Sequence, residues 1–479
     1  MADEPASIAH LHHADDAGRN SPTLKALRRE VLRLAIPAVG EQMVLLMAGI
    51  VETVLIGHLG AAPLVALGLS NQLAMLSTVL FMLLAVGGGV LVAQATGAGQ
   101  VERVHRVFGQ SLWLSLLTGV GLMLTGLLVA TPALRLMGAE AEAVRLGTPF
   151  LRLLAASMPF QGFVFVASAC LRGAGDTRTP MLVVAATTIV QVLSSAALVY
   201  GVGGFAEMGT PGAAVGALAG RAAGAGLLLV WLWHGRLPLR LREVNWRIDR
   251  PAVEEIVRLG SPSGGEQLAL RLGQIANVRI VAGLGTVGYA AYLVAFNSVV
   301  LAFLIGIGFT AAATTVVGQR VGAGDEIGAR SGARQAWGLA AGTMGLMGIA
   351  FAFAARPLLG FFTSDLQVVA LGVVPLQLVS LALPAEATNQ VLSGALRGAG
   401  DTRWPMVVTA TGNWLIRLPL TLILAGPFGL IGVWWAVIAD MVLRALVNIW
   451  RFRGTAWLPA IRPRAVMEQS GLWRSGRNS

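Results

Sequence analysis

Long runs of apolar residues, separated by short polar or glycine-containing segments, make up most of the chain. Stretches of about 20 residues with almost no charge recur along its whole length, and each can cross a hydrocarbon core of roughly 30 Å as a helix. Clear examples are Trp113 to Leu134, Met181 to Phe205, Leu284 to Gly318 and Trp404 to Asp440. The last two are long enough for two passes each. The pattern predicts an all-α integral membrane protein.

Composition agrees with the bilayer as the solvent of this chain. Of the 479 residues, 55% are hydrophobic and 12% are charged, which is more apolar surface than a water-soluble domain needs. The 60 glycines suit helices that pack closely in lipid, where small residues let backbones approach one another. The single cysteine, Cys170, has no partner for an intrachain disulfide.

The placement of positive charge predicts how the chain crosses the membrane. The net charge is +11, and the basic residues gather in alternate loops between the apolar spans. By the positive-inside rule these loops and both termini face the cytoplasm, which predicts twelve spans in a cell inner membrane. The basic excess is then a topology signal with an affinity for anionic membrane lipids, and it does not indicate nucleic-acid binding. The loops contain Arg19 to Arg33, Arg103 and Arg106, Arg172 and Arg178, Arg236 to Arg258, Arg320 to Arg334, Arg397 and Arg403, and Arg451 to Arg477.

An internal repeat covers nearly the whole chain. LRGAGDTRTPM at Leu171 to Met181 recurs as LRGAGDTRWPM at Leu396 to Met406, 225 residues later. Because each copy has an even number of spans, both copies enter the membrane from the same side. The sequence thus predicts twelve transmembrane helices in two six-helix lobes related by a parallel pseudo-two-fold repeat. The same shift aligns Pro37, Gly40, Glu41 and Gln42 with Pro262, Gly265, Glu266 and Gln267, Gln94, Gly97 and Gly99 with Gln319, Gly322 and Gly324, and Pro159 with Pro384.

The repeat and a charged connector set the expected domain boundaries. A pathway between the lobes, opened to either side as one lobe rocks against the other, follows from the symmetry. Two lobes already enclose such a pathway, so a monomer is sufficient. We expect a disordered cytoplasmic tail over 1–27, an N-terminal six-helix lobe over 28–235, a cytoplasmic linker over 236–253, a C-terminal six-helix lobe over 254–453 and a basic cytoplasmic tail over 454–479.

Ionisable side chains inside the spans are the candidate functional residues, because each costs roughly a few kcal/mol in lipid. Glu41 and Glu52 are eleven residues apart, so they share one face of a helix, and the repeat places Glu266 and Asn277 in the same relation. The acidic candidates are Glu41, Glu52, Glu266, Glu386 and Asp440, and the basic candidates are Arg152, Arg221, Arg271, Arg279, Arg417 and Arg444.

A second polar stripe is expected in the tenth span. Glu386, Asn389 and Gln390 lie at i, i+3 and i+4, and the repeat partner of Glu386 is Gln161. In the next span Arg417 is the expected counter-ion of one of the carboxylates. For Glu41 and Glu266, a capping or packing role at the cytoplasmic helix ends is the alternative to a place in the inner vestibule. The residues expected to line a substrate cavity are Glu41, Glu266, Gln161, Asn389, Gln390, Asn413 and Arg417.

The duplicated LRGAGDTR, PAVGEQ leading to VETVLIGHLG, and the paired VAQATGAG and VGQRVGAG resemble the multidrug and toxic compound extrusion (MATE) family. The resemblance covers Leu32 to Phe452 and implies two V-shaped lobes that export organic, often cationic, drugs in exchange for sodium or protons. It implies ion or proton coupling at Glu52 and Glu386, which fall where the family has aspartates, with Asn277 as the counterpart of Glu52. The alternatives are a permanent ion pair for Glu52 and an interhelical hydrogen bond for Glu386.

The LRGAGDTR motifs themselves predict a structural role. Their aspartates are helix-capping residues just ahead of a proline that suits a first helical turn. Their arginines are expected at headgroup level on the cytoplasmic side, and a gating role is the alternative. The residues concerned are Arg172, Asp176, Arg178, Arg397, Asp401 and Arg403.

Two departures from the family weaken a residue-by-residue transfer. The archaeal branch has an NxxxD pattern in the fifth span, where this chain has Gln191 and Ser195. NorM-type members have a glutamate in the seventh span near Leu270, whereas Glu266 lies a turn earlier.

The sequence therefore predicts a secondary active exporter of small organic cations or drugs, with Na⁺ or H⁺ as coupling ion and no other cofactor or metal. There is no Walker motif, so ATP bound to this chain does not drive transport. The alternative is a lipid-linked oligosaccharide flippase of a related fold, which a cavity lined mainly by arginine would favour. An enzyme is not expected, because His58, His105 and His234, the histidines outside the N-terminal tail, lie at loop edges.

Overall fold

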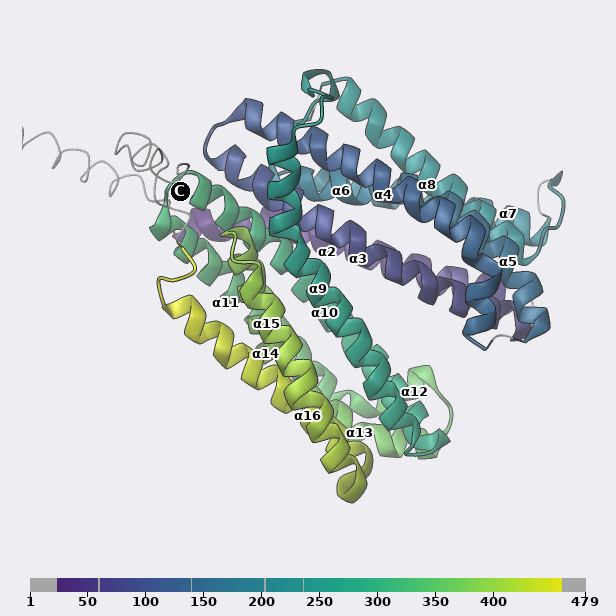
Figure 1. The fold of residues 1–479 in the computed structure, drawn as a ribbon. Coiled ribbons are helices and arrows are strands. Elements are labelled where there is room, and N and C mark those ends of the chain that lie inside the picture. The colour runs from purple at the N-terminus through teal and green to yellow at the C-terminus, as the bar shows by residue number, and fades with distance from the viewer. Residues whose placement is uncertain (1–23, 59–60, 139, 202–203, 236, 459–479) are drawn as a thin grey trace, which may run out of the picture.

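The computed structural model describes residues 24–58, 61–138, 140–201, 204–235 and 237–458, which are almost entirely helical and contain no strand (Figure 1). Residues 1–23 and 459–479 of the two expected tails lie outside this description. The first helix already begins at Leu24, so 24–27 are helical. In chain order the elements are α2 (Leu24–Gly57), α3 (Ala61–Gly97), α4 (Val101–Leu136), α5 (Ala141–Ala156), α6 (Met158–Gly173), α7 (Arg178–Tyr200), α8 (Thr210–Trp233), η2 (Leu241–Glu243), α9 (Arg250–Ala282), α10 (Thr286–Gly322), α11 (Glu326–Phe353), α12 (Ala355–Phe362), α13 (Leu366–Leu381), α14 (Leu383–Gly398), α15 (Arg403–Thr411), η3 (Gly412–Arg417) and α16 (Leu418–Arg453).

Within the described ranges, eight helices are long and apolar enough to cross a membrane, or up to ten if two bent pairs each form one span. Helix α10 is continuous, so the apolar run from Leu284 to Gly318 makes one pass rather than the two that its length allowed. The 51 residues from Arg403 to Arg453 count as one of the eight, but the backbone breaks at Gly429 (φ 55°, ψ −135°). Figure 1 shows the chain reversing direction in this stretch. Helix α9 is not among the eight, since charged and small polar residues lower its hydropathy.

The two bent pairs occupy corresponding places in the repeat. Helices α5 and α6 meet at 45°, and α13 and α14 meet at 48°. In each pair the second helix carries a proline in its first turn, Pro159 in α6 and Pro384 in α14. Proline lacks the amide that would continue the preceding helix, so the duplicated proline explains the duplicated bend.

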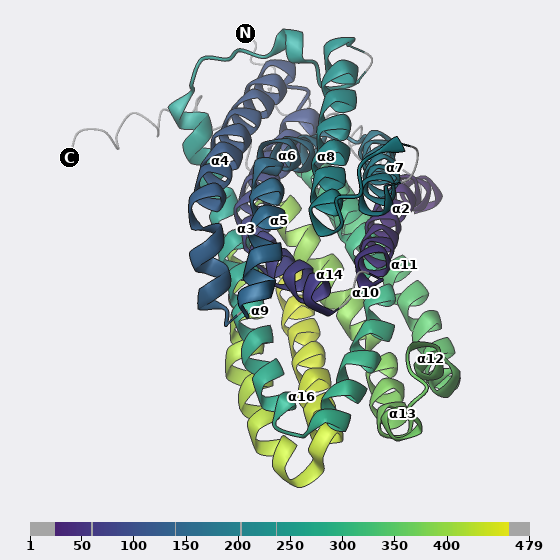
Figure 2. The same ribbon diagram turned by 90° about the vertical axis from the view of Figure 1, so that its right-hand side faces the viewer.

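The helices form two groups that diverge from a common end (Figure 1). The largest apolar core consists mainly of residues from Val281 to Leu458, and the three smaller cores lie between Ile56 and Ile256. The first residues of α2 pack in the core of the second half, and the first residues of α9 pack in a core of the first half. Residues such as Val31 of α2 belong to the large core, and Ile256 of α9 belongs to a core of the first half. Helix α2 therefore packs against both α7 and α10 (Figure 2).

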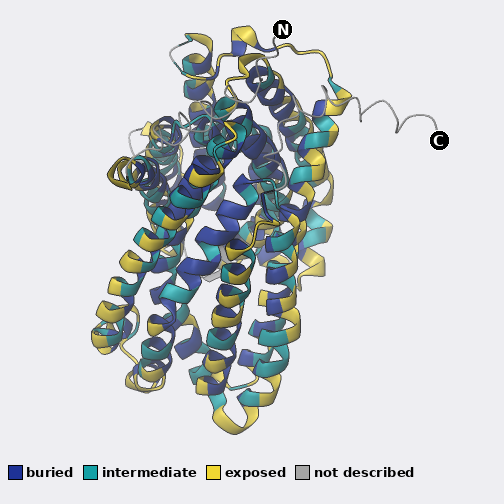
Figure 3. Cartoon of the chain, turned by 90° about the vertical axis from the view of Figure 1, so that its left-hand side faces the viewer, coloured by how far each residue is buried: buried dark blue, intermediate teal, exposed yellow. Residues whose placement is uncertain are grey.

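Large apolar side chains face outward along the helices. Leu128, Phe353 and Phe361 are 79%, 88% and 85% exposed. Figure 3 shows exposed positions along the outer faces of the helices and buried positions between them. A water-soluble protein rarely exposes so much apolar surface, whereas a bilayer solvates it without cost.

Two reciprocal hydrogen bonds join the halves at the end where the groups meet. Gln94, at the end of α3, donates from Nε2 to the carbonyl oxygen of Gly398 at 3.0 Å. Gln319, at the end of α10, donates from Nε2 to the carbonyl oxygen of Gly173 at 2.9 Å. Both donors and both acceptors are 225 residues apart in the sequence. We call these four residues the reciprocal seal.

Glycines let the helix ends approach closely enough for the seal to form. Gly97 lies directly against the backbone of Gln319, and Gly322 lies against the backbone of Gln94. A Cβ at either glycine would collide with that backbone. Contact between the halves, rather than packing within one half, thus explains Gly97 and Gly322, whereas the repeated Gly99 and Gly324 have positive φ of 68° and 75°.

The arginine-bearing segments lie at this same end, where their side chains form ion pairs with glutamates and aspartates. Arg320, just beyond Gln319, binds Glu30 of α2 at 3.0 Å. Arg451 binds Asp401 at 2.7 Å, and Arg103 binds Glu255 at 2.9 Å. The basic loops therefore lie on one side of the helix bundle, as the charge pattern predicted.

We expect the double substitution of Gln94→Ala with Gln319→Ala to destabilise the protein. Each change removes one hydrogen bond between the halves, which is worth about 1 kcal/mol. Thermal unfolding in detergent should show a lower Tm for each single variant and a roughly additive loss for the double variant. Gln100→Ala, at an exposed position beyond α3, is the matched control. A double variant that melts with the parent would contradict a stabilising role for the seal.

Candidate functional site

Two buried ion pairs related by the repeat hold two of the candidate carboxylates. Arg172 Nη1 donates to both carboxylate oxygens of Glu41 at 3.0 Å. Arg397 Nη2 donates to both oxygens of Glu266 at 2.8 Å, and the Thr409 hydroxyl donates to the same glutamate at 3.0 Å. The arginines come from the last turns of α6 and α14 and are partly buried, so their side chains point toward α2 and α9. Both carboxylates are thereby neutralised. The expected position of these arginines at headgroup level stays a prediction.

The aspartates of the LRGAGDTR motifs cap the following helices, as their sequence position predicts. Asp176 Oδ1 accepts hydrogen bonds from the amides of Arg178 and Thr179 at 3.1 and 3.0 Å. Asp401 Oδ1 accepts one from the amide of Trp404 at 3.3 Å. The side chains of Arg178 and Arg403 are exposed.

Glu52 of α2 has no ion-pair partner within 4.0 Å in the described part of the chain. Its Oε2 lies 3.5 Å from Nε2 of Gln191 in α7. Arg221 of α8 acts on Glu52 electrostatically, but its Nη1 donates at 2.5 Å to the hydroxyl of Ser157. The first half therefore contains a carboxylate that is near a positive charge without being bound to it.

Glu386 of α14 lies in a network of polar side chains. Gln390 donates to its Oε1 at 3.0 Å and Asn389 to its Oε2 at 3.5 Å, so the polar stripe on this helix is formed as predicted. Arg444 of α16 approaches Oε2 only to 3.8 Å, and it binds Asp440 at 2.8 Å. Glu386 is thus the second carboxylate without a close arginine.

The remaining predicted residues are distributed over the second half. Asn277 is buried and donates to the Tyr292 hydroxyl at 3.3 Å. Asn413 contacts the carbonyl oxygen of Ala269 at 3.4 Å. Arg417 forms no ion pair with any described residue, and Arg444 is instead the arginine nearest to Glu386. The sequence named Arg444 as a candidate but offered no signal that would favour it over Arg417.

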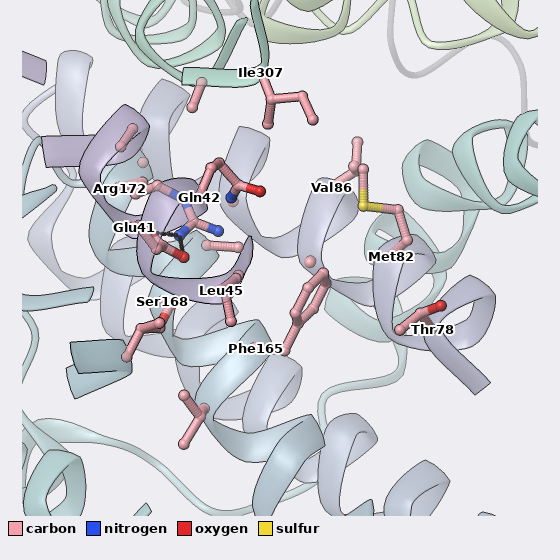
Figure 4. A pocket seen from close by; sticks show the side chains of 18 of the residues that line it. Glu41, Gln42, Leu45, Thr78, Met82, Val86, Phe165, Ser168, Arg172 and Ile307 are labelled. Atoms are coloured by element: carbon pink, nitrogen blue, oxygen red, sulfur yellow. Dashed lines mark hydrogen bonds and ion pairs between the residues drawn. The ribbon is translucent and has the colours of Figure 1, made fainter. Parts of the chain in front are cut away.

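A cavity of about 550 Å³ lies mainly in the first half and is bounded on the other side by α10 (Figure 4). Its walls are largely apolar and include Leu45, Met82 and Phe165. Of the predicted cavity residues, Glu41 and Gln161 line it, and the buried Oε1 of Gln161 has no hydrogen-bond partner among the described residues. Its other polar and charged lining residues include Gln42, Gln191, Arg172, Arg221 and Arg397. Glu266, Asn389, Gln390, Asn413 and Arg417 do not line it.

Known proteins resemble this chain over nearly its whole length. The MatE family model matches residues 37–196 and 262–423, which are the two halves of the repeat. The probable multidrug resistance protein NorM of Thermotoga maritima is 32% identical over 436 residues, 90% of this chain and 93% of that protein. That of Rhizobium meliloti is 30% identical and covers 88% and 92%. A solved structure described as the outward-facing conformation of a multidrug resistance MATE family transporter of the MOP superfamily shares the fold, with a TM-score of 0.84 at 23% identity over 91% and 97% of the two chains.

We expect Arg172→Gln to destabilise the protein strongly, because it leaves Glu41 buried without a positive partner. Breaking a buried pair from one side costs about 3 kcal/mol or more. The double variant Glu41→Gln with Arg172→Gln removes both charges and should recover most of that loss. Unfolding in detergent measures both effects, with Arg178→Gln as an exposed control. If the double variant were no more stable than Arg172→Gln, the charge pair would not be the source of the loss.

Proposed function

Because this chain belongs to the multidrug and toxic compound extrusion (MatE) family of transporters, we propose that it exports organic compounds in exchange for Na⁺ or H⁺. Members of this family are transporters rather than enzymes. The observation that supports exchange is that only two of these four buried acids lie in close contact with an arginine. Glu41 and Glu266 are bound by arginines at 3.0 and 2.8 Å, whereas Glu52 and Glu386 have no arginine that close.

The physical argument concerns the neutralisation of charge in lipid. A carboxylate within a helix bundle is stable only when a positive charge or a proton neutralises it. An arginine in permanent contact does this in every conformation, so such an acid has nothing to exchange. Glu52 and Glu386 can instead take a cation from one side of the membrane and release it to the other. In this proposal Asn277 is the neutral counterpart of Glu52.

We further propose twelve spans in two lobes of six. The bent pairs give α5 with α6 and α13 with α14 one span each, α9 supplies another, and the break at Gly429 divides Arg403–Arg453 into two. With the remaining seven helices this makes twelve. The gathering of arginines at one end supports a cytoplasmic location for that end and for both termini, in a cell inner membrane where the arginines meet anionic lipid headgroups.

Alternating access follows from the contact between the halves. The reciprocal seal closes the basic end, and the helix groups diverge away from it (Figure 1). Opening to the cytoplasm would require these hydrogen bonds to break as the lobes rock. One chain contains both lobes, so a monomer suffices for the cycle.

The cavity favours amphipathic organic compounds as substrates. Leu45, Met82 and Phe165 offer apolar and polarisable contacts, and thioether and aromatic groups adapt to varied ligands. Glu41 is the acidic lining residue, and its charge is already matched by Arg172. Small organic cations or drugs are the substrates that we propose to test first, and nucleic acid is not among them.

A second candidate is a flippase for lipid-linked oligosaccharides, since three of the four charged cavity residues are arginines: Arg172, Arg221 and Arg397. Two of these arginines are already bound to glutamates, which weakens the attraction for a phosphate. Transbilayer movement of a fluorescent lipid pyrophosphate in proteoliposomes, dependent on Arg221, would favour this candidate.

We expect proteoliposomes loaded with ethidium to release the dye faster when the external medium is more acidic or richer in sodium than the lumen. Glu52→Gln and Glu386→Gln should each reduce the gradient-driven rate by about tenfold or more, because neither amide can carry the cation across. Glu102→Gln, an exposed acid at the start of α4, should transport normally. A release rate independent of both gradients would contradict exchange, and unchanged rates in the two variants would contradict the choice of residues.

A further inference from the structure

Three ionisable side chains meet in the second half of the protein. Arg444 Nη2 lies 2.8 Å from Asp440 Oδ2, one turn earlier on α16. The same nitrogen lies 3.8 Å from Oε2 of Glu386 on α14. We call Glu386, Asp440 and Arg444 the acid–arginine triad. It links two helices through one guanidinium group.

The triad is buried and its charges do not balance. The side chains of Glu386, Asp440 and Arg444 are 10%, 1% and 11% exposed. Two carboxylates and one guanidinium carry a net charge of −1 when all are ionised. A buried charge of this kind is costly, and one monovalent cation would neutralise the group.

The triad also leaves a buried acceptor unused. Asp440 Oδ1 has no hydrogen-bond partner among the described residues, and it lies against Gly412. Gly412 begins the π-helical turn η3, and a side chain there would collide with Asp440 and Arg444. Single π-helical turns frequently occur at functional sites. The glycine and the π-helical turn at Gly412 thus leave space for the side chains of Asp440 and Arg444.

The repeat shows that the fold does not require these charges. Gly209 (φ 58°, ψ −133°) and Gly429 (φ 55°, ψ −135°) break the backbone in the same way in the two halves. The spans that follow these glycines therefore align at a shift of 220 residues, whereas the shift at α14 is 225. The three positions of the first half that correspond to the triad are neutral: Gln161, Gly220 and Gly224. The second half carries two acids and one arginine that packing alone does not explain.

Other charged groups near the triad are already neutralised. Glu266 of α9 acts electrostatically on Arg444, but it is bound by Arg397 of α14. The neighbours from α11 and α10 are uncharged: Trp337 donates to the Thr388 hydroxyl at 2.8 Å, and Gly306 lies against Gln390. The surplus negative charge thus belongs to the triad itself.

We propose that Asp440 and Arg444 are positioning residues that set the capacity of Glu386 to a single cation, either Na⁺ or H⁺. When the cation is bound to Glu386, Arg444 forms an ion pair with Asp440 alone. When the cation leaves, Arg444 is shared between both acids and draws α14 and α16 together. This inference rests on the proposed exchange of cations and adds to it the two residues that determine the charge of the second-half site.

The test measures how many cations the purified full-length protein binds. All variants carry Glu52→Gln, so that the first half contributes no cation site. Binding of radioactive sodium at equilibrium and proton uptake after a pH step in sodium-free buffer distinguish the two cations. When Asp440→Asn is added, Arg444 is free to pair with Glu386. We then expect the affinity for whichever cation the Glu52→Gln protein binds to fall at least tenfold. Adding Arg444→Met to Asp440→Asn restores a net charge of −1, and cation binding should return.

Several outcomes are decisive. Full binding by the Asp440→Asn protein would overturn the proposal, as would a folded double variant that fails to recover. If the double variant does not fold, Asp440→Glu replaces it as the charge-conserving variant and should bind normally, and loss of binding in that protein would overturn the proposal. Ethidium efflux by proteins that keep Glu52 separates the two proposals. Cation binding by the parent protein without gradient-driven efflux contradicts the exporter, whereas normal coupled efflux by the single variant Asp440→Asn contradicts the triad.

Discussion

The need to neutralise carboxylates inside a lipid-embedded helix bundle organises this structure. Arg172 and Arg397 meet that need for Glu41 and Glu266 in the same way in both halves, at distances of 3.0 and 2.8 Å. These pairs fasten the first helix of each half to the end of its bent span. Glu52 and Glu386 lie outside this scheme, and in the proposed exchange a mobile ion neutralises them. The proposal therefore assigns stability and exchange to different acids.

The duplication explains which features are symmetric and which are not. The reciprocal seal uses Gln94 and Gln319 equally, because each half presents the same helix end to the other. The acids that we propose for exchange do not match between the halves. The first half has Glu52 where the second has Asn277, and the second has Glu386 where the first has Gln161. In the proposed exchange, one such acid in each half would let the two sites differ in chemistry without disturbing the contact between the halves.

The sequence predicted the helical fold, the family and the capping aspartates, because these depend on local pattern and on the repeat. Pro159 and Pro384 also marked both bends through their duplication. Partners across the fold were harder to predict. Arg172 lies 131 residues from Glu41, and its motif reads as a loop. Arg417 and Arg444 have similar settings in the sequence, and only the packing of α16 against α14 places Arg444 beside Glu386.

In the proposed exchange, α10 connects the cavity with α14, the helix that carries Glu386. Thr310 and Thr314 of α10 line the cavity. The same helix also contacts α14: the Thr314 hydroxyl donates to the carbonyl oxygen of Gly394 at 2.9 Å, and Gly306 lies against Gln390. A shift of α14 on release of the proposed cation from Glu386 would therefore move a wall of the cavity. Under the proposal, ion and substrate need not compete directly for one acid, and a substrate needs no charge to be displaced by the ion. This suits a cavity whose own charges are largely matched.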